Sequence, residues 1–220
     1  MQRQHPSRET HAHPVLKHPG RASRIRVDSG EAFEEHVMFF RKFLRAPLKT
    51  GSVLPSSEYL TREMVKPVDW PRARHVAELG AGTGVFTRRI DEMYRPDAEV
   101  LIFEKDDAMR QRLHAQFPEL SFHPDALHLR EILAQRGIPP LDGIISGLPF
   151  SNFPPSLRNG ILDEAAGALA PDGVFVTFMY SLRLVGDLKK RFRSVRTTLV
   201  PLNFPPAFVH VCRGPLGVSH

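Results

Sequence analysis

Apolar residues recur with a helical period in the first part of the chain. Within residues 31–46 the spacing is i, i+4, i+7 and i+11, formed by Phe33, Val37, Phe40 and Leu44. This spacing places the four side chains on one stripe of a helix. The opposite side carries charged residues, and Pro47 ends the pattern because proline lacks the backbone N–H that a helix interior needs. We therefore predict an amphipathic, aromatic-rich helix over residues 31–46.

From residue 72 onward, short apolar runs alternate with helical patterns. Strands are predicted at 73–79, 98–104, 120–126, 141–150, 173–180, 195–202 and 207–213, and helices near 84–93, 106–116, 155–169 and 183–192. Such alternation indicates an α/β fold with a mostly parallel sheet and helices on both faces. Only residues 203–206 join the last two strands, too few for a crossover helix. The seven-stranded sheet therefore contains one antiparallel strand near the C-terminus.

Length and composition limit the domain organisation. The chain has 220 residues, of which 41% are hydrophobic, and this suits one globular domain, which we place at residues 72–214. Residues 1–30 are rich in Pro, His and Arg and are predicted to be a disordered or weakly ordered extension; 31–71 form the helical segment, and 215–220 a short tail. The apolar runs are too short to span a bilayer, and the first residues lack the apolar core of a secretory signal.

The cysteine count and the net charge indicate the cellular compartment and the kind of binding partner. The one cysteine, Cys212, excludes an internal disulfide framework and a cysteine-based zinc cluster, which favours a reducing cytoplasm. The early histidines lack supporting carboxylates, so no metal site is expected. A formal charge of +6 favours an anionic partner, either nucleic acid or anionic lipid. The alternative is a basic protein with no polyanionic partner.

A glycine-rich loop follows the first predicted strand and opens the next helix. Gly80 and Gly82, with Ala81 and Thr83 between and after them, let a ligand lie against the backbone near the free N–H groups of a helix start. Glu104 ends the second strand, where a carboxylate can accept hydrogen bonds from both hydroxyls of a ribose. We predict that these residues and the adjacent Lys105 bind a nucleoside-containing cofactor.

Two further acids indicate which cofactor this is. Glu78 precedes the glycines, and a carboxylate there suits the cationic amino-acid end of S-adenosylmethionine but would repel a pyrophosphate. Asp125 follows the third strand, where it can accept from an adenine amino group with Ala126 beside the ring. The alternative for Asp125 is a turn residue after Pro124.

With these motifs, residues 72–213 resemble a class I S-adenosylmethionine-dependent methyltransferase with a Rossmann-like fold. Two segments, KTGSVLPSS at 49–57 and LPFSNFP at 148–154, are similar to those of the bacterial phospholipid N-methyltransferases, and the resemblance extends over residues 33–213. It implies methylation of the amine of phosphatidylethanolamine and its methylated derivatives towards phosphatidylcholine, with S-adenosylhomocysteine as the second product. The group is related to the rRNA adenine dimethylases.

The residue at position 146 helps to decide between the two possible substrates, a phospholipid amine and an adenine base of RNA. The adenine dimethylases carry an Asn-Leu-Pro-aromatic motif in this place, whose Asn binds the exocyclic amine of a flipped base. A serine hydroxyl cannot reproduce the paired donor and acceptor of an amide, so Ser146 argues against base methylation, although Phe150 keeps the aromatic position. We assign Ser146 to the cofactor site and, with Phe150, to the amine pocket.

The expected chemistry is direct attack of a neutral amine on the sulfonium methyl group, for which the enzyme mainly supplies alignment. No residue stands out as a general base. Tyr180, at the end of the fifth strand, is the predicted polar contact to the amine. Phe150, Phe153 and Tyr180 are candidates for cation–π contact with a quaternary ammonium product, and the alternative for each Phe is core packing.

The helix at 31–46 is predicted to bring the enzyme to its lipid. Its apolar stripe suits the bilayer interface, and Arg41, Lys42 and Arg45 suit an anionic phospholipid surface. We thus expect a cytoplasmic enzyme attached peripherally to the inner face of the membrane. The alternative is that this helix covers the ligand site.

Two other functions are the rivals of this hypothesis. One is an rRNA adenine methyltransferase, which is disfavoured by Ser146 and by the lack of a C-terminal helical RNA-binding domain after residue 213. The other is a non-enzymatic binding module.

Overall fold

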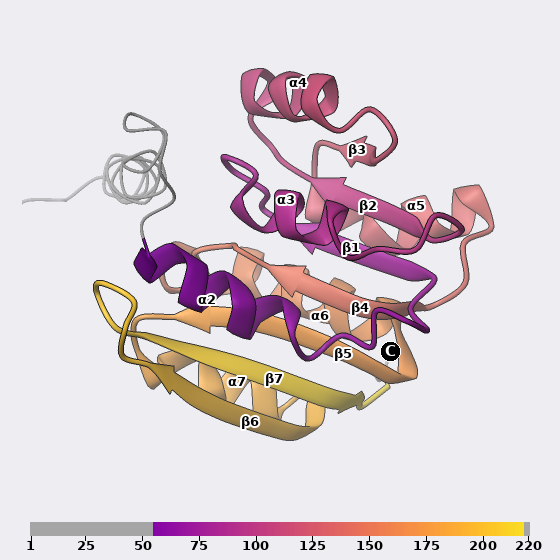
Figure 1. The fold of residues 1–220 in the computed structure, drawn as a ribbon. Helices are drawn as coiled ribbons and strands as arrows, with labels where there is room; N and C mark the ends of the chain where they lie inside the picture. The colour runs from indigo at the N-terminus through magenta and orange to yellow at the C-terminus, as the bar shows by residue number, and fades with distance from the viewer. Residues whose placement is uncertain (1–54, 218–220) are drawn as a thin grey trace, which may run out of the picture.

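The computed structural model describes residues 55–217, with side chains described from residue 58 onward (Figure 1). The extension at 1–30 and the amphipathic helix at 31–46 lie outside the described residues, so both stay predictions. The described part of the chain begins with α2 (Pro55–Val65). This helix precedes the first strand in the sequence and packs on the sheet.

One seven-stranded sheet forms the centre of the molecule (Figure 1). Its strands are β1 (His75–Leu79), β2 (Glu99–Phe103), β3 (Ser121–His123), β4 (Leu141–Ser146), β5 (Leu169–Met179), β6 (Phe192–Val200) and β7 (Ala207–Pro215). They are ordered β3-β2-β1-β4-β5-β7-β6, and β7 is antiparallel to both of its neighbours. The predicted sheet with one antiparallel strand near the C-terminus is confirmed.

Helices cover both faces of the sheet. They are α3 (Val85–Asp91), α4 (Asp107–Gln116), α5 (Leu129–Arg136), α6 (Pro155–Ala168) and α7 (Val185–Lys189), with short 3-10 turns η2 (Ala126–His128), η3 (Phe150–Asn152) and η4 (Leu182–Leu184). Apolar residues of α2, α3 and α4 share one core cluster with one face of the sheet. Residues of α5, α6 and α7 form the second core cluster on the other face.

Two helices were not predicted, and one is shorter than predicted. The Leu129–Arg136 helix buries only Leu129 and Leu133, so its apolar stripe is too narrow to read from the sequence. Residues 55–65 had been included in a longer N-terminal segment without a helix of their own. The basic helix expected at 183–192 is α7 with only five residues, because η4 precedes it and β6 begins at Phe192.

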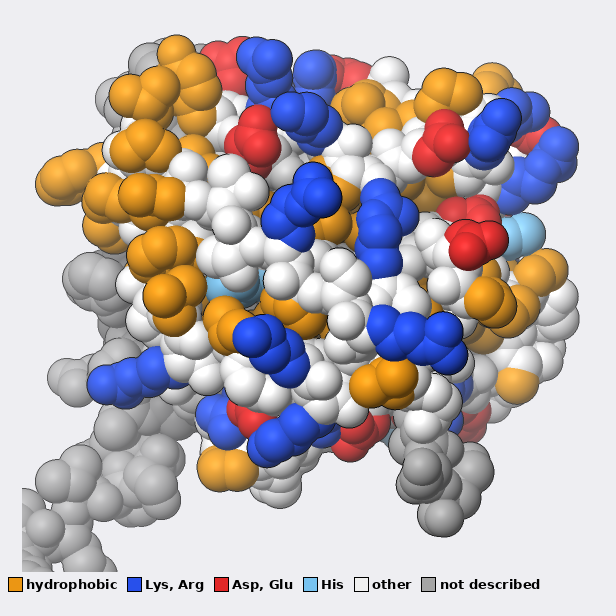
Figure 2. Space-filling view, turned by 90° about the horizontal axis from the view of Figure 1, so that it is seen from below, with side chains coloured by type: hydrophobic (Ala, Val, Ile, Leu, Met, Phe, Trp, Pro, Cys, Tyr) orange, Lys and Arg blue, Asp and Glu red, His pale blue; other side chains and the backbone are white. Residues whose placement is uncertain are grey.

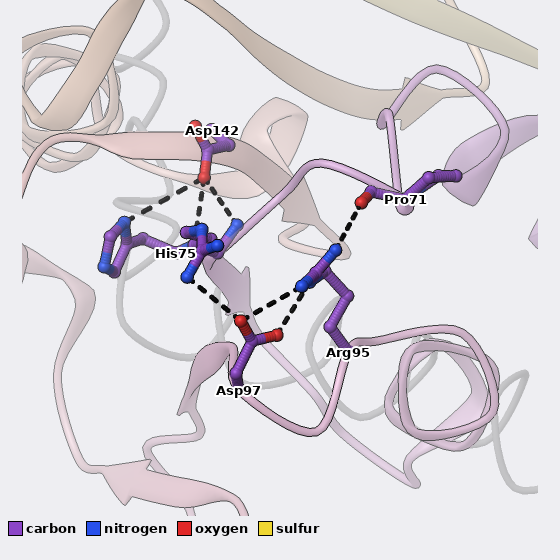
Figure 3. A network of polar contacts seen from close by, with 6 residues as sticks. Pro71, His75, Arg95, Asp97 and Asp142 are labelled. Atoms are coloured by element: carbon purple, nitrogen blue, oxygen red, sulfur yellow. Dashed lines mark hydrogen bonds and ion pairs between the residues drawn. The ribbon is translucent and has the colours of Figure 1, made fainter.

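The direction of the strands gives the sheet two different edges. We call the edge at which β1 to β6 end the carboxyl edge, and the edge at which they begin the amino edge. A polar network joins the loops of the amino edge (Figure 3). Asp142 accepts from the backbone N–H of His75 at 3.0 Å, and Arg95 binds both oxygens of Asp97 and the carbonyl of Pro71. These contacts hold the starts of β1 and β4 in register.

No helix between residues 55 and 217 is long and apolar enough to cross a bilayer. The same described region contains no group of three His, Cys, Asp or Glu side chains arranged to hold a metal ion.

Candidate functional site

The glycine loop turns the chain sharply at the carboxyl edge. Gly80, Gly82 and Gly84 have φ of 77°, 57° and 81°, a left-handed conformation that residues with a Cβ rarely adopt. The backbone N–H groups of Gly80 and Ala81 both donate to the carbonyl of Phe103, at 2.8 and 3.1 Å. The loop is therefore anchored to the end of β2 before α3 begins at Val85.

The segment after β4 lies directly against this loop. Gly147 donates its N–H to the carbonyl of Leu79 at 2.9 Å. A Cβ at Gly80 would lie 2.6 Å from Cδ2 of Leu148, and a Cβ at Gly147 would lie 2.8 Å from the carbonyl oxygen of Gly80. Both glycines are thus needed for close approach, and the two motif segments form one site.

Glu78 is fully buried at the end of β1. One carboxyl oxygen accepts from the hydroxyl of Thr87 at 2.7 Å, while Oε1 has no hydrogen-bond partner among the described residues. Burial, together with the nearby charge of Glu104, raises the pKa of Glu78 to about 8 despite the hydrogen bond from Thr87. A buried carboxyl with an unused oxygen suits a cationic ligand group such as an ammonium.

Glu104 joins the glycine loop to the start of α4. Its Oε2 accepts from the N–H of Gly82 at 2.7 Å, and its Oε1 accepts from the N–H of Asp106 at 2.8 Å. Each carboxylate oxygen retains a second lone pair, so these bonds leave acceptors for ribose hydroxyls. The side chain is almost completely buried, which fixes its direction.

The predicted adenine contacts lie at the end of β3. Asp125 caps η2 by accepting from the N–H of Leu127 at 3.0 Å, and its other oxygen lies 3.9 Å from Nζ of Lys105. The side chain therefore plays the part of a turn residue and also keeps acceptor capacity at this edge. Ala126 is buried beside it, and Thr83 is half-buried in the glycine loop.

The three residues predicted to contact the amine have different surroundings. Ser146 is buried at the end of β4, with its hydroxyl 3.4 Å from the N–H of Leu148. Phe150 is also completely buried, with its ring centroid 5.9 Å from that of Phe153 and 6.5 Å from that of Phe175. Phe150 therefore packs among core aromatic side chains, as the packing alternative expects, and its part in the amine pocket stays a prediction.

Tyr180 remains accessible, with 39% of its surface exposed. Burial of the rest of the side chain raises its pKa to about 12, although a hydrogen bond with Asn203 acts in the opposite direction. The phenol is consequently neutral near pH 7. Its ring lies edge-on to Phe178, with centroids 5.8 Å apart.

Sequence reasoning missed three residues of this region. Thr87 supports Glu78, Leu148 packs on Gly80, and Asn203 bonds Tyr180 from the turn between β6 and β7. Thr87 lies in the first turn of α3, only nine residues after Glu78, so proximity in the sequence was the signal that could have found it. The other two depend on contacts between segments far apart in the chain.

The chain was compared with known proteins. No family profile matches it. It is 33% identical over 186 residues to the ornithine lipid N-methyltransferase of Singulisphaera acidiphila, an alignment that covers 82% of this chain and 97% of that protein. The N-methyltransferase NodS of Bradyrhizobium japonicum, solved with S-adenosylhomocysteine, has a similar fold: the TM-score is 0.63 at 11% identity, covering 86% of this chain and all of NodS.

A second structure illustrates how general the fold is. The 16S rRNA methyltransferase RsmC of T. thermophilus, in complex with AdoMet and guanosine, gives a TM-score of 0.54 at 24% identity. The alignment covers 75% of this chain, and the chain spans 44% of the length of RsmC. The shared fold does not distinguish lipid from RNA.

The strand order, the glycine loop and the buried acids at the ends of β1 and β2, together with the similarity to these methyltransferases, identify a class I methyltransferase that uses S-adenosylmethionine. Within that class, the chain belongs to the family of the ornithine lipid N-methyltransferase of Singulisphaera acidiphila.

Proposed function

We propose that this enzyme transfers methyl groups from S-adenosylmethionine to the primary amine of a membrane aminolipid. The observation that carries the proposal is the similarity to an ornithine lipid N-methyltransferase along 97% of that protein's length. The sequence motifs favour phosphatidylethanolamine, and the curated relative favours ornithine lipid. Both headgroups present a primary aliphatic amine, which is the chemistry that the site must recognise.

The residues of the carboxyl edge would hold the cofactor. Glu78 offers a buried carboxyl to the ammonium of the cofactor, Glu104 offers acceptors to the ribose, and Asp125 offers one to the adenine. The bound cofactor supplies an electrophilic sulfonium methyl group. Gly80 and Gly147 allow the two loops to approach each other closely, so the residues of both loops lie at one site.

Tyr180 is the side chain best placed to orient the amine. Its neutral hydroxyl can accept a hydrogen bond from an N–H of the substrate, and its hydrogen bond with Asn203 holds the phenol in place. An aliphatic ammonium has a pKa of about 10, so the substrate must lose a proton before it reacts. A partly desolvated position beside Tyr180 favours the neutral amine.

Recruitment to the membrane by residues 31–46 is part of this proposal. On that reading, Phe33→Ser with Phe40→Ser abolishes binding to vesicles, because the apolar stripe no longer enters the interface. Arg41→Glu with Arg45→Glu weakens binding chiefly to anionic vesicles, as does added salt for the wild type. Co-sedimentation with anionic and neutral vesicles measures both effects, with thermal melts to exclude unfolding.

The test of function is a direct product assay. The full chain is incubated with methyl-labelled S-adenosylmethionine and, separately, with vesicles containing phosphatidylethanolamine, vesicles containing ornithine lipid, and ribosomal RNA. We expect label in an aminolipid, and mass spectrometry then identifies which lipid and how many methyl groups it carries.

Two controls make this assay decisive. Vesicles of phosphatidylcholine alone contain no primary amine and should stay unlabelled. A Tyr180→Phe variant should lose methyl transfer while its affinity for S-adenosylmethionine stays unchanged, because Tyr180 is assigned to the amine alone. Label in RNA with none in either aminolipid would contradict the proposal and favour the rRNA methyltransferase.

A further inference from the structure

Five large apolar side chains are exposed along one stretch of the carboxyl edge. They are Tyr180 and Leu182 after β5, Leu199 near the end of β6, and Leu202 and Phe204 in the turn between β6 and β7, with exposed fractions of 39%, 54%, 50%, 61% and 82%. We call this set the apolar rim. In Figure 1 the β6–β7 turn projects at the left, the side towards which β4 and β5 point. Figure 2 shows hydrophobic side chains gathered along the same left edge.

The apolar rim is joined to the predicted amine site. Asn203, at the centre of the turn, is buried, hydrogen-bonds Tyr180, and donates from Nδ2 to the carbonyl of Pro205 at 2.6 Å. These bonds fix the turn with its apolar residues directed outward on either side of Asn203. A surface bound by the rim would therefore lie next to the residue assigned to the substrate amine.

The two chain segments that form the rim carry charge of one sign. Residues 180–184 and 199–206 contain one cation, Arg183, and no acid. The exposed Arg196 lies on the edge strand β6, three residues before Leu199. Figure 2, which views the molecule from the side of β6, shows Lys and Arg side chains, with some Asp and Glu among them, beside the hydrophobic left edge. An apolar rim bordered by cations is complementary to the interface of an anionic bilayer.

We propose that the apolar rim is a lipid-contact surface, with the β6–β7 turn dipping into the bilayer so that an aminolipid headgroup reaches Tyr180. This inference rests on the proposed lipid substrate. It adds a second contact, built into the catalytic domain, to the one predicted for residues 31–46.

The test places a fluorophore in the turn. Phe204→Trp introduces an exposed indole, while the natural Trp70 is buried and hydrogen-bonded to the carbonyl of Val65 and gives a constant background. We expect vesicles of anionic lipid with brominated acyl chains to quench the added indole by at least half. Leu216→Trp is the matched control, because Leu216 is 39% exposed but lies beyond the end of β7 at the amino edge. Its indole should not be quenched.

A second variant measures the consequence. Leu202→Ser with Phe204→Ser should weaken binding to anionic vesicles at least tenfold and lower methylation of vesicle lipid to match. Melting temperature and methylation of detergent-dispersed lipid should stay close to those of the wild type. Both changes lie at exposed positions, so a folding defect is not expected, and the Phe204→Trp variant provides an independent measurement.

Several results would overturn the inference. Absence of quenching at position 204, or vesicle binding unaffected by the serine substitutions, would place the lipid contact elsewhere. Blue-shifted emission from position 204 without vesicles, unchanged when they are added, would show that the rim is covered by residues 1–54 or by a second copy; sedimentation velocity separates these two. Quenching at position 204 with no methylation of any lipid would sustain the lipid contact and reject the proposed function.

Discussion

Charged residues lie at both the amino edge and the carboxyl edge of the sheet, but they differ in burial and in hydrogen bonding. At the amino edge, Asp142 and Asp97 are partly exposed, and each has hydrogen-bond partners in neighbouring loops (Figure 3). At the carboxyl edge, Glu78 is completely buried with one oxygen that has no partner among residues 55–217. The backbone differs too, because left-handed glycines cluster at the carboxyl edge.

The two edges therefore contribute differently to the stability of the folded state. A satisfied, solvent-exposed network lowers the free energy of the folded state without needing a ligand. A buried carboxyl with a raised pKa and a loop in left-handed conformation raise the free energy of the folded state. Such features persist at sites where binding of a ligand offsets that cost. Changes at the two edges should therefore have different effects on stability and on cofactor binding.

The largest effect is expected from Gly80→Ala. Forcing a Cβ into a left-handed residue costs about 1–2 kcal/mol, and crowding of a packed site adds about 1–3 kcal/mol, because Leu148 must move away from the loop. Calorimetry should show cofactor affinity reduced at least tenfold, and thermal melts should show lower stability. Gly137→Ala is the matched control, since φ is 65° there but nothing lies within 4 Å. It should lose stability from strain alone and retain full affinity; equal losses of affinity in both variants would contradict a local role for Gly80.

Glu104→Ala should follow in size. Removing a charged acceptor that also holds the loop should weaken S-adenosylmethionine binding by roughly 1.5–3 kcal/mol, the range for hydrogen bonds to charged groups. Glu92→Ala offers a control at the end of α3, because Glu92 is exposed and pairs with Arg89 three residues before it. Calorimetric titration of both variants gives the comparison. Unchanged affinity in Glu104→Ala would remove Glu104 from the cofactor site.

Glu78 should make cofactor binding depend on pH. With a pKa of about 8 instead of 4.5, the folded protein without cofactor holds this proton near pH 7. The raised pKa stabilises the fold at low pH, and that contribution is lost as pH rises from 4.5 to about 8. An ammonium favours the carboxylate, so affinity should rise about tenfold per pH unit below pH 8, with proton release on binding.

Calorimetry at pH 7 in buffers of different ionisation enthalpy measures this proton release. Glu78→Gln preserves the shape of the side chain and its contact with Thr87 but cannot ionise, so the pH dependence should disappear in that variant. Binding without proton release in the wild type would show that Glu78 does not meet the cationic end of the cofactor.

The smallest effect is expected at the amino edge. Asp97→Ala removes the partner of Arg95 and Arg74, but these side chains are exposed to solvent, where ion pairs contribute little. We expect a slight decrease in melting temperature and no change in cofactor affinity. A loss of affinity in Asp97→Ala would show that the two edges are coupled through the sheet, contrary to the separation described above.

Local pattern was enough to predict the seven strands, the helices α3, α4, α6 and α7, the antiparallel pairing of the last two strands, and the position of the glycine loop. These features follow from short-range causes: side-chain period, connection length and the conformational freedom of glycine. Helix α5 was missed because it buries only two leucines. The predicted contacts of Glu78, Glu104 and Asp125 with a cofactor follow from the rule that parallel strands carry their ligands at the carboxyl edge.

Side-chain burial, packing contacts and shifted pKa values depend on which segments, distant in the sequence, come together in the fold. No local sequence pattern encodes these long-range contacts. Leu148 packs on Gly80 across 68 positions of sequence, and Phe150 is drawn into the core by Phe153 and Phe175. The raised pKa of Glu78 requires complete burial, which the surrounding elements impose together. The exposure of Phe204, finally, reflects a turn held at its centre by Asn203, with no helix from residues 55–217 packed over its apolar tip. Sequence therefore determines which residues stand at the ends of strands, whereas packing decides which of them are buried, paired or free to meet a ligand.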